Sequence, residues 1–501
     1  MFKNFHGFNM VEAYHEWKKT HRHKNSFAQT TKLLIAVITL LVLWNMPLDS
    51  FGIDGLTIIQ QRVIAIFAFA ILMWLFEAVP AWTTSMLVVV ILLFTTSNSS
   101  LWIFNDSANP NYGTPIPYMA IMNCFADPII MLFIGGFILA IAATKTGLDV
   151  LLARVMLKPF GTQSRFVLLG FILVTAIFSM FLSNTATAAM MLTFLTPVLK
   201  SLPADGKGKI ALALSIPVAA NIGGMGTPIG TPPNAIALKY LNDPAGMNMN
   251  IGFGEWMAFM IPLTFVLIFI AWIVLLKIFP FTKKNVELKI EGETKKDWRS
   301  IVVYITFAVT ILLWMTDKIT GVNSNVVAML PIAVFAVTGV INKRDLEEIN
   351  WSVLWMVAGG FALGVVLQQT GLAANLIKAI PFNTWSPALV LVGSGLICYA
   401  MANFISHTAT AALLVPILAV VGQSMSANLA SLGGVSTLLI GVAVGSSVAM
   451  ILPISTPPNA LAHATGMIEQ KHMVKVGVIM GAFGLVLGYT MLILLGSNGL
   501  I

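Results

Sequence analysis

Four short motifs occur twice in the sequence, in the same order. The pairs, first copy then second, are GGF at 135 and 359, TGL at 146 and 370, SNTATAAM at 183 and SHTATAAL at 406, and TPPNA at 231 and 456. Their offsets are 224, 224, 223 and 225 residues. Self-similarity of this kind is typical of a chain built from two copies of one structural unit. The fold must therefore place two similar halves against each other.

The second constraint is the apolar character of the runs that carry these motifs. Of the residues, 57% are hydrophobic and 10% are charged, whereas about a quarter are charged in a soluble domain. Crossing a bilayer takes about 20 apolar residues, and the sequence contains many such runs. We therefore expect an all-α integral membrane protein. Cys124 and Cys398 stand alone without a CxxC motif, so neither a disulfide nor a metal site is expected.

The net charge of +8 does not predict a nucleic-acid partner, because Lys and Arg cluster in loops between the apolar runs. Such loops remain in the cytoplasm, so they assign each run a direction. The pattern predicts a basic cytoplasmic tail at 1–31, a first helix and outer loop at 32–60, a first repeat at 61–281, a cytoplasmic linker at 282–299 and a second repeat at 300–501. The tail is not interpreted as a signal peptide, since no small-residue cleavage site follows it.

Eleven spans are expected, with the N-terminus inside and the C-terminus outside. They lie at 32–47, 62–80, 82–96, 126–148, 210–238, 256–276, 301–316, 325–341, 351–374, 436–462 and 476–495. Five spans fall in each half, and an odd number turns the second copy upside down. Inverted repeats of this kind are the plan of secondary transporters, whose binding site lies near the midplane.

Two further apolar runs, 166–199 and 385–429, are too long for one span and have polar centres. Each is predicted to be a re-entrant hairpin, turning at Ser183-Asn184-Thr185 in the first and at Ser406-His407-Thr408 in the second. Because irregular backbone is tolerated at membrane depth only beside protein or water, these tips are expected to face a cavity.

The paired prolines of the TPPNA motifs cannot continue a helix, so the spans that contain them should break. The second half-helix would begin at Thr231-Pro232 or Thr456-Pro457, just as returning helices begin at Ser183 and Ser406. Four helix N-termini then converge, and each offers free N–H groups and about half a positive charge to an anion. The hairpins and broken spans contain no Lys, Arg, Asp or Glu, and His407 is their only side chain that titrates near neutral pH.

The paired SNT-type tips, the paired TPPN breaks and the stretch Glu77-Ala78-Val79-Pro80 resemble the divalent anion/sodium symporter (DASS, or INDY-like) family. The resemblance covers nearly the whole chain from about residue 30. It implies a homodimer in the bilayer of a bacterial plasma membrane, in which a scaffold holds a transport domain that moves as an elevator. It also implies C4 and C5 dicarboxylate substrates (succinate, malate, fumarate, 2-oxoglutarate), no enzymatic activity and no cofactor beyond sodium.

By position, the resemblance also implies a set of binding residues. Substrate carboxylates would be bound by residues of the tips and breaks, namely Ser183, Asn184, Thr185, Thr231, Pro232, Ser406, His407, Thr408, Thr456 and Pro457. One sodium site would be formed by Ser179, Ser183, Asn184 and the carbonyl of Gly230.

The second half departs from the family pattern, which has Asn in place of His407 and a hydroxyl in place of Ala402. A second sodium site is therefore in doubt. His407 is either a neutral residue hydrogen-bonded in the tip, or it replaces the cation or touches substrate. The second reading is favoured, because an ionisable group inside a membrane is functional by default.

These departures favour exchange of one dicarboxylate for another over sodium-coupled symport of dicarboxylate, citrate or sulfate. An anion channel would need charged rings along a continuous pore, and an intramembrane hydrolase would need an acidic partner beside Ser406-His407. Both are disfavoured. Glu77 is interpreted as structural, and the Gly-Gly pairs are interpreted as sites of close helix packing.

Overall fold

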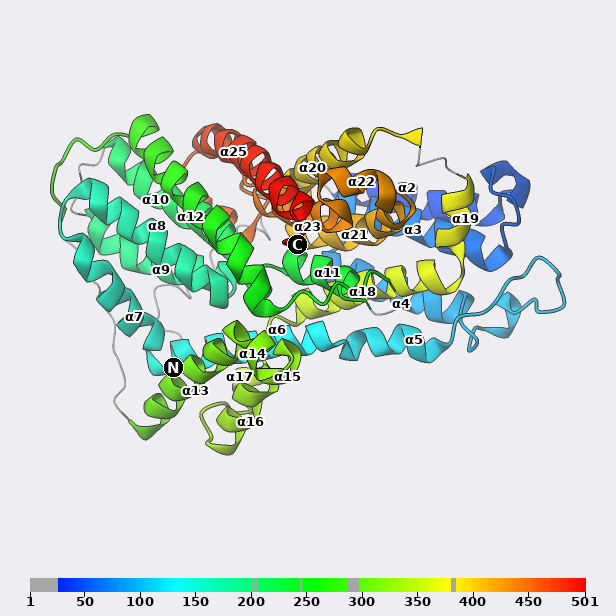
Figure 1. Cartoon of the computed structure of the whole chain (residues 1–501), viewed down its shortest axis with the longest axis horizontal. Helices are drawn as coiled ribbons and strands as arrows, with labels where there is room; N and C mark the ends of the chain where they lie inside the picture. The colour runs from blue at the N-terminus through cyan, green and yellow to red at the C-terminus, as the bar shows by residue number, and fades with distance from the viewer. Residues whose placement is uncertain (1–25, 201, 203–205, 244–245, 287–296, 380–383) are drawn as a thin grey trace.

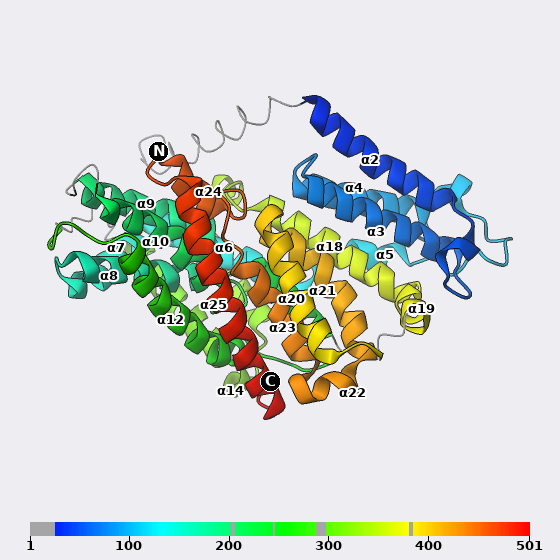
Figure 2. The ribbon, with the colours of Figure 1, turned by 90° about the horizontal axis from the view of Figure 1, so that it is seen from above.

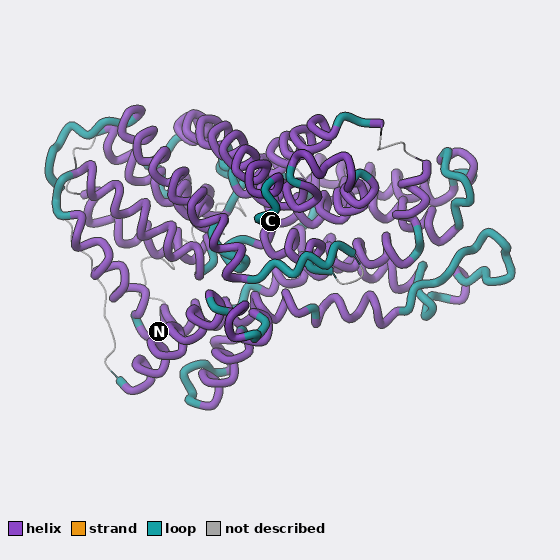
Figure 3. The backbone as a smooth tube through the Cα atoms, in the orientation of Figure 1, coloured by secondary structure: helices purple, strands orange, loops and turns teal. Residues whose placement is uncertain are grey.

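The computed structural model of the chain describes residues 26–200, 202, 206–243, 246–286, 297–379 and 384–501. These residues form helices joined by loops, without a β-strand among them (Figure 3). Most of the basic tail at 1–31 and the lysines Lys289, Lys295 and Lys296 of the linker lie outside the described residues.

The first half comprises α2 (Ser26–Asn45), α3 (Ile58–Phe76), α4 (Ala81–Thr95), α5 (Tyr118–Met122), α6 (Pro128–Thr146), α7 (Leu148–Leu157), α8 (Ser164–Phe181), α9 (Asn184–Lys200), α10 (Lys207–Gly224), α11 (Pro232–Leu241) and α12 (Phe253–Ile278). The second half comprises α13 (Trp298–Met315), α14 (Asp317–Thr320), α15 (Ser324–Val327), α16 (Met329–Val337), α17 (Lys343–Leu346), α18 (Trp351–Gln369), α19 (Leu372–Ala379), α20 (Pro387–Phe404), α21 (His407–Ser424), α22 (Ser426–Leu429), α23 (Gly434–Ser447), α24 (Pro457–Ala464) and α25 (Gln470–Ser497). Short 3₁₀ turns lie at Leu48–Phe51, Trp102–Phe104, Asn123–Ala126, Lys158–Phe160 and Ala430–Leu432.

Every expected span coincides with a helix, a pair of short helices or a broken helix. Nine of the described helices are long and apolar enough to cross a bilayer, which confirms the all-α membrane fold. The helices of the two hairpins are among them or close to them in length. The number of crossings and the orientation of the chain remain predictions.

Local sequence signals set where these helices begin and end. The Asp127 side chain accepts a hydrogen bond from the Ile129 N–H at 3.0 Å, with Pro128 in the first turn of α6. Gly147 then ends α6 in the left-handed region, at φ 73°. Glu77 ends α3 in the same region, at φ 45°, a conformation that is uncommon for a residue with a side chain.

Figures 1 and 2 show α2, α3 and α4 together on one side of the molecule and α7 to α10 with α12 on the other. The long helix α18 packs against α4 and α3, and also against the hairpin helix α21. On the other side, α10 packs against α8, α9 and α12. The first hairpin (α8 and α9) and α10 therefore belong to the second of these groups.

The two halves interlock at their breaks. The short helix α11, from the first half, packs against α21 and α23 of the second. In return, α24 of the second half packs against α9 and α10 of the first. Each broken helix thus crosses into the other half, which is the arrangement expected when inverted repeats build one site between them.

The Gly-Gly pairs are sites of close packing, as predicted. A Cβ atom on Gly135 would lie 2.3 Å from the Ala328 carbonyl oxygen, and one on Gly359 would lie 2.4 Å from Ser85 Cβ. Both distances are far below van der Waals contact. In these positions only glycine lets the helices approach so closely.

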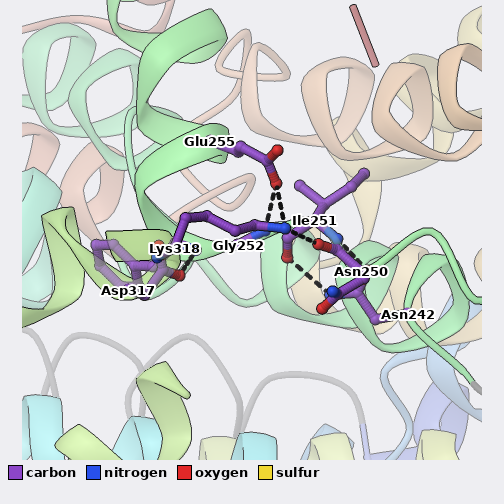
Figure 4. A network of polar contacts seen from close by, with 8 residues as sticks. Asn242, Asn250, Ile251, Gly252, Glu255, Asp317 and Lys318 are labelled. Carbon is purple, nitrogen blue, oxygen red and sulfur yellow. Dashed lines mark hydrogen bonds and ion pairs between the residues drawn. The ribbon is translucent and has the colours of Figure 1, made fainter. Parts of the chain in front are cut away.

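Polar contacts join the ends of several helices (Figure 4). Asn242, just after α11, exchanges two hydrogen bonds with the backbone of Ile251. Lys318 of α14 donates to the Asn250 carbonyl at 2.6 Å and forms an ion pair with Glu255 of α12 at 3.1 Å. The loop between α11 and α12 is thereby fixed to α14.

Candidate functional site

The tips of both hairpins are helix N-termini. At the first tip, the Ser183 hydroxyl accepts the Ala186 N–H at 3.2 Å, and α9 begins at Asn184. At the second tip, the Ser406 hydroxyl accepts the Ala409 N–H at 3.2 Å, and α21 begins at His407. Serine is among the best residues for this role. The predicted helix starts at both tips are therefore confirmed.

Both broken helices resume where the prolines predict. Thr231 is the N-cap of α11, and Thr456 is the N-cap of α24. Only the second hydroxyl makes the capping bond: Thr456 Oγ1 accepts the Asn459 N–H at 3.3 Å, whereas the Thr231 side chain makes no such bond. The equal capping roles expected of the two threonines are thus observed on one side only.

Three oxygen atoms and the Asn184 amide meet behind the first tip, in a cluster that we call the oxygen cage. The amide of Asn184 faces the carbonyl of Gly230 at 3.0 Å, the carbonyl of Ala220 at 3.2 Å and the Ser179 hydroxyl at 2.5 Å. Ser179 also donates to the Ala220 carbonyl at 2.8 Å. With its nitrogen toward these groups, the amide donates to the carbonyls. With its oxygen toward them, four oxygens face one another, an arrangement that a bound cation would stabilise.

Two glycines leave the space for this cage. A Cβ on Gly224 would lie 2.7 Å from the Asn184 amide oxygen, and a Cβ on Gly230 would lie 2.4 Å from the Gly224 carbonyl. Any larger residue would therefore fill or deform the cage. The donor set of hydroxyl, amide and unwound carbonyls suits a small monovalent cation such as sodium. Of the predicted sodium ligands, Ser179, Asn184 and Gly230 come together here, and Ser183 adjoins them as the cap.

The first break is held open by side-chain hydrogen bonds. Asn234 Nδ2 donates to the carbonyls of Gly224 at 3.0 Å and Thr227 at 2.8 Å. The Thr227 hydroxyl donates to the Met180 carbonyl of the hairpin and accepts the Gly230 N–H at 3.1 Å. Carbonyls that the helix leaves unpaired are thereby satisfied, and the hairpin is tied to the break.

The second break is also held by side-chain hydrogen bonds, but its hydroxyl stands at a different position of the motif. Ser455, which corresponds to Gly230, donates to the Asn403 carbonyl of the hairpin at 3.0 Å and accepts the Leu452 N–H at 3.1 Å. Asn459 Nδ2 donates to the Leu452 carbonyl at 3.0 Å. Asn403, Ser455 and Thr227 were not singled out from the sequence, since lone polar residues in hairpins and breaks carry no spacing signal.

The second tip has no counterpart of the oxygen cage. His407, at the position of Asn184, lies with Nε2 2.7 Å from the Ala449 carbonyl oxygen. A carbonyl only accepts, so this ring nitrogen carries a proton. Ala402, at the position of Ser179, is buried and supplies a methyl group. An imidazole N–H thus points at the carbonyl that corresponds to Gly224 in the first half.

The two breaks are joined by one side chain that the sequence analysis missed. Asn221 of α10 donates from Nδ2 to Thr456 Oγ1 and to Asn459 Oδ1, both at 3.2 Å. All three residues are buried. The available signal was an amide in the otherwise apolar stretch from 210 to 222, where Ser215 is the only other polar side chain.

The remaining predicted substrate residues differ in their exposure. Thr408 and Thr231 are buried, Thr185 and Pro232 are half-buried, and Pro457 is exposed. Among the described charged side chains, Lys239 of α11 pairs with Asp127 at the start of α6, and Lys145 pairs with Asp345 at 2.5 Å. The site consists of hydroxyls, amides, helix N-termini and one imidazole.

The chain was compared with families and proteins already described. The family model of citrate transporters (CitMHS) matches residues 71–432. An uncharacterized transporter of Haemophilus influenzae is 31% identical over 490 residues, which cover 94% of this chain and 96% of that protein. The sodium-dependent dicarboxylate transporter SdcS of Staphylococcus saprophyticus is 28% identical over 480 residues, covering 89% of this chain and 88% of that protein.

Among solved structures, the YdaH transporter of Alcanivorax borkumensis superposes with a TM-score of 0.53 at 13% sequence identity. The match covers 76% of this chain and 88% of that one. At this identity the likeness concerns the fold alone. The sequence relatives confirm the family resemblance predicted from the paired motifs.

Proposed function

This chain belongs to the citrate transporter family, and from that premise we propose that it carries C4 and C5 dicarboxylates across the plasma membrane by exchanging one for another. The family and the apolar helices establish a membrane transporter of the citrate and dicarboxylate type, not an enzyme. The choice of substrate and the mode of coupling are the proposal.

The chemistry of the site supports a dianion as substrate. Two hairpin tips and two breaks present helix N-termini, and hydroxyls or amides stand at each of them. Such N-termini bind carboxylates through free N–H groups and the helix dipole. We assign one carboxylate to Asn184 and Thr185 and the other to Thr408, with Thr231 and Thr456 at the breaks completing the contacts.

The oxygen cage of the first half supports a sodium ion as co-substrate. The Ser179 hydroxyl and the carbonyls of Ala220 and Gly230 each lie within hydrogen-bond distance of the Asn184 amide. When sodium is present, the Asn184 amide oxygen would turn toward it and the amide nitrogen would turn toward the substrate. Cation and anion would then stabilise each other through one side chain.

Exchange is supported above all by the second tip, where an imidazole N–H points at the Ala449 carbonyl at 2.7 Å and Ala402 replaces a hydroxyl. A dianion in a low-dielectric site needs compensating charge, and this half offers His407 in place of a second cation. Without substrate, the charge of the transport domain would then be uncompensated. Its return would require a second dicarboxylate, which makes the exchange obligatory.

Sodium-coupled symport is the second candidate. It is favoured by the oxygen cage and by the similarity to a protein named as a sodium-dependent dicarboxylate transporter. In either mode we propose a homodimer with an elevator-type transport domain and a cytoplasmic N-terminus, in a bacterial plasma membrane. Citrate and sulfate are the alternative substrates to be tested.

The substrate assignment is tested by competition. Purified protein is reconstituted in liposomes loaded with succinate, and entry of radiolabelled succinate is measured against external malate, fumarate, 2-oxoglutarate, citrate and sulfate. We expect the four-carbon and five-carbon dicarboxylates to compete and the other two anions to compete weakly. Strong competition by citrate or sulfate alone would overturn the assignment.

A further inference from the structure

The Thr456 hydroxyl is surrounded by donors. Asn221 Nδ2 lies 3.2 Å from its oxygen, and the Asn459 backbone N–H lies 3.3 Å from it. A hydroxyl has two acceptor lone pairs and one hydrogen. Because an amide NH₂ and a backbone N–H can only donate, both lone pairs are occupied. The hydroxyl hydrogen is then the one part of the group left to bind something else, and it must bind an acceptor.

The first break lacks this arrangement. Thr231, which corresponds to Thr456, accepts no capping bond. Ser446, which corresponds to Asn221, donates its hydroxyl to the Val442 carbonyl of its own helix at 2.9 Å. In the described part of the chain, the Thr231 hydroxyl is therefore not oriented by a donor from the other half. The asymmetry depends on a single amide, at position 221.

We propose that Asn221 is a positioning residue that fixes the Thr456 hydroxyl as an obligatory hydrogen-bond donor to a substrate carboxylate. The proposal rests on the assignment of Thr456 to the substrate site. An ionised carboxylate accepts and cannot donate, so a hydroxyl already turned toward it loses no orientation on binding. Asn221 lies in the helix that also carries the Ala220 carbonyl of the oxygen cage. Asn221 therefore connects the oxygen cage of the first half with the proposed carboxylate contact, Thr456, of the second half.

Asn221 also donates to Asn459 Oδ1 at 3.2 Å, which turns the Asn459 amide nitrogen toward the Met450 and Leu452 carbonyls. A purely structural role would act through this second bond. The two roles differ in one respect: the positioning role requires the hydroxyl of Thr456, and the structural role does not.

The test is a double-mutant cycle on succinate exchange in liposomes. Asn221→Ala should raise KM about tenfold, the range for one hydrogen bond to a charged group, with kcat changed less than twofold. Thr456→Ala should raise KM at least as much. In the Thr456→Ala background, Asn221→Ala should have no further effect on KM, whereas in the Thr456→Ser background it should retain its full effect.

Ser446→Ala is the matched control, because it removes a buried polar group at the symmetry-related position, and its KM should stay at the wild-type value. Asn221→Leu fills the volume of the amide and keeps the test open should the alanine variant fail to fold. Succinate-induced thermal stabilisation in detergent gives an affinity that does not depend on transport.

Each outcome decides between the two assignments. An undiminished effect of Asn221→Ala without the Thr456 hydroxyl would overturn the positioning role and leave the structural one. A wild-type KM in Asn221→Ala beside a raised KM in Thr456→Ala would refute the inference but keep the substrate site. A wild-type KM in Thr456→Ala would remove that residue from the proposed substrate site itself.

Discussion

Ser179→Ala is the perturbation that most directly probes the oxygen cage. The hydroxyl lies 2.8 Å from the Ala220 carbonyl and 2.5 Å from the Asn184 amide, and it is fully buried. Without a cation, the Asn184 amide nitrogen still reaches the Ala220 carbonyl at 3.2 Å. No buried carbonyl is left unpaired, so the fold should lose little stability.

With sodium in the cage, the variant lacks one of four oxygen ligands. Losing one polar contact to a charged group costs about 1–3 kcal/mol, which corresponds to an affinity for sodium about 5- to 150-fold weaker. The assay is succinate exchange at increasing sodium concentrations, always equal on both sides of the membrane, with choline making up the remaining salt. The half-saturating sodium concentration is then measured without a gradient. Thr175→Ala, which removes another buried hydroxyl of α8, one without a hydrogen-bond partner, is the matched control. An unchanged half-saturating concentration in Ser179→Ala would refute the cage as a sodium site.

Four further predictions follow from the same contacts. Asn184→Ala should weaken succinate binding by at least about 1–3 kcal/mol, and wild-type affinity in a folded variant, measured by thermal shift, would remove it from the site. His407→Asn should impair exchange without adding sodium coupling, whereas Ala402→Ser with His407→Asn should add sodium stimulation, as followed by sodium titration of exchange. Glu77→Gln should lower yield or melting temperature more than transport per molecule, and full abundance without transport would contradict its structural role. Burial raises the pKa of Asp149, so this carboxyl stabilises the fold most at low pH and less as the pH rises through its folded pKa. Asp149→Asn should therefore raise the melting temperature at neutral pH, and an unchanged melting temperature would contradict this.

The fold could be predicted from the sequence because its main signals are local. Paired prolines end helices wherever they occur, so the breaks at Thr231 and Thr456 could be located from the motif alone. The polar centres of two apolar runs too long for one span located both hairpin tips, and the serine in each marks a helix N-terminus. The repeated order of these motifs then predicted two similar halves, and the odd number of spans in each predicted that they are inverted.

The contacts between the halves could not be predicted in the same way. Asn221 meets Thr456 and Asn459 across more than 230 positions of sequence, separations of 235 and 238 residues, and no periodicity records such a pairing. The hydroxyl that ties each hairpin to its break is Thr227 in one half and Ser455 in the other. Because the two occupy different places in the motif, a comparison of the copies position by position conceals their common role.

The central claim is that transport is an obligatory exchange of dicarboxylates. It is tested by uptake of radiolabelled succinate into liposomes that are either empty or loaded with unlabelled succinate, each with equal sodium and with an inward sodium gradient. Exchange predicts rapid uptake into loaded vesicles at equal sodium and almost none into empty vesicles under either condition. Robust uptake into empty vesicles driven by the sodium gradient would contradict the account and establish symport.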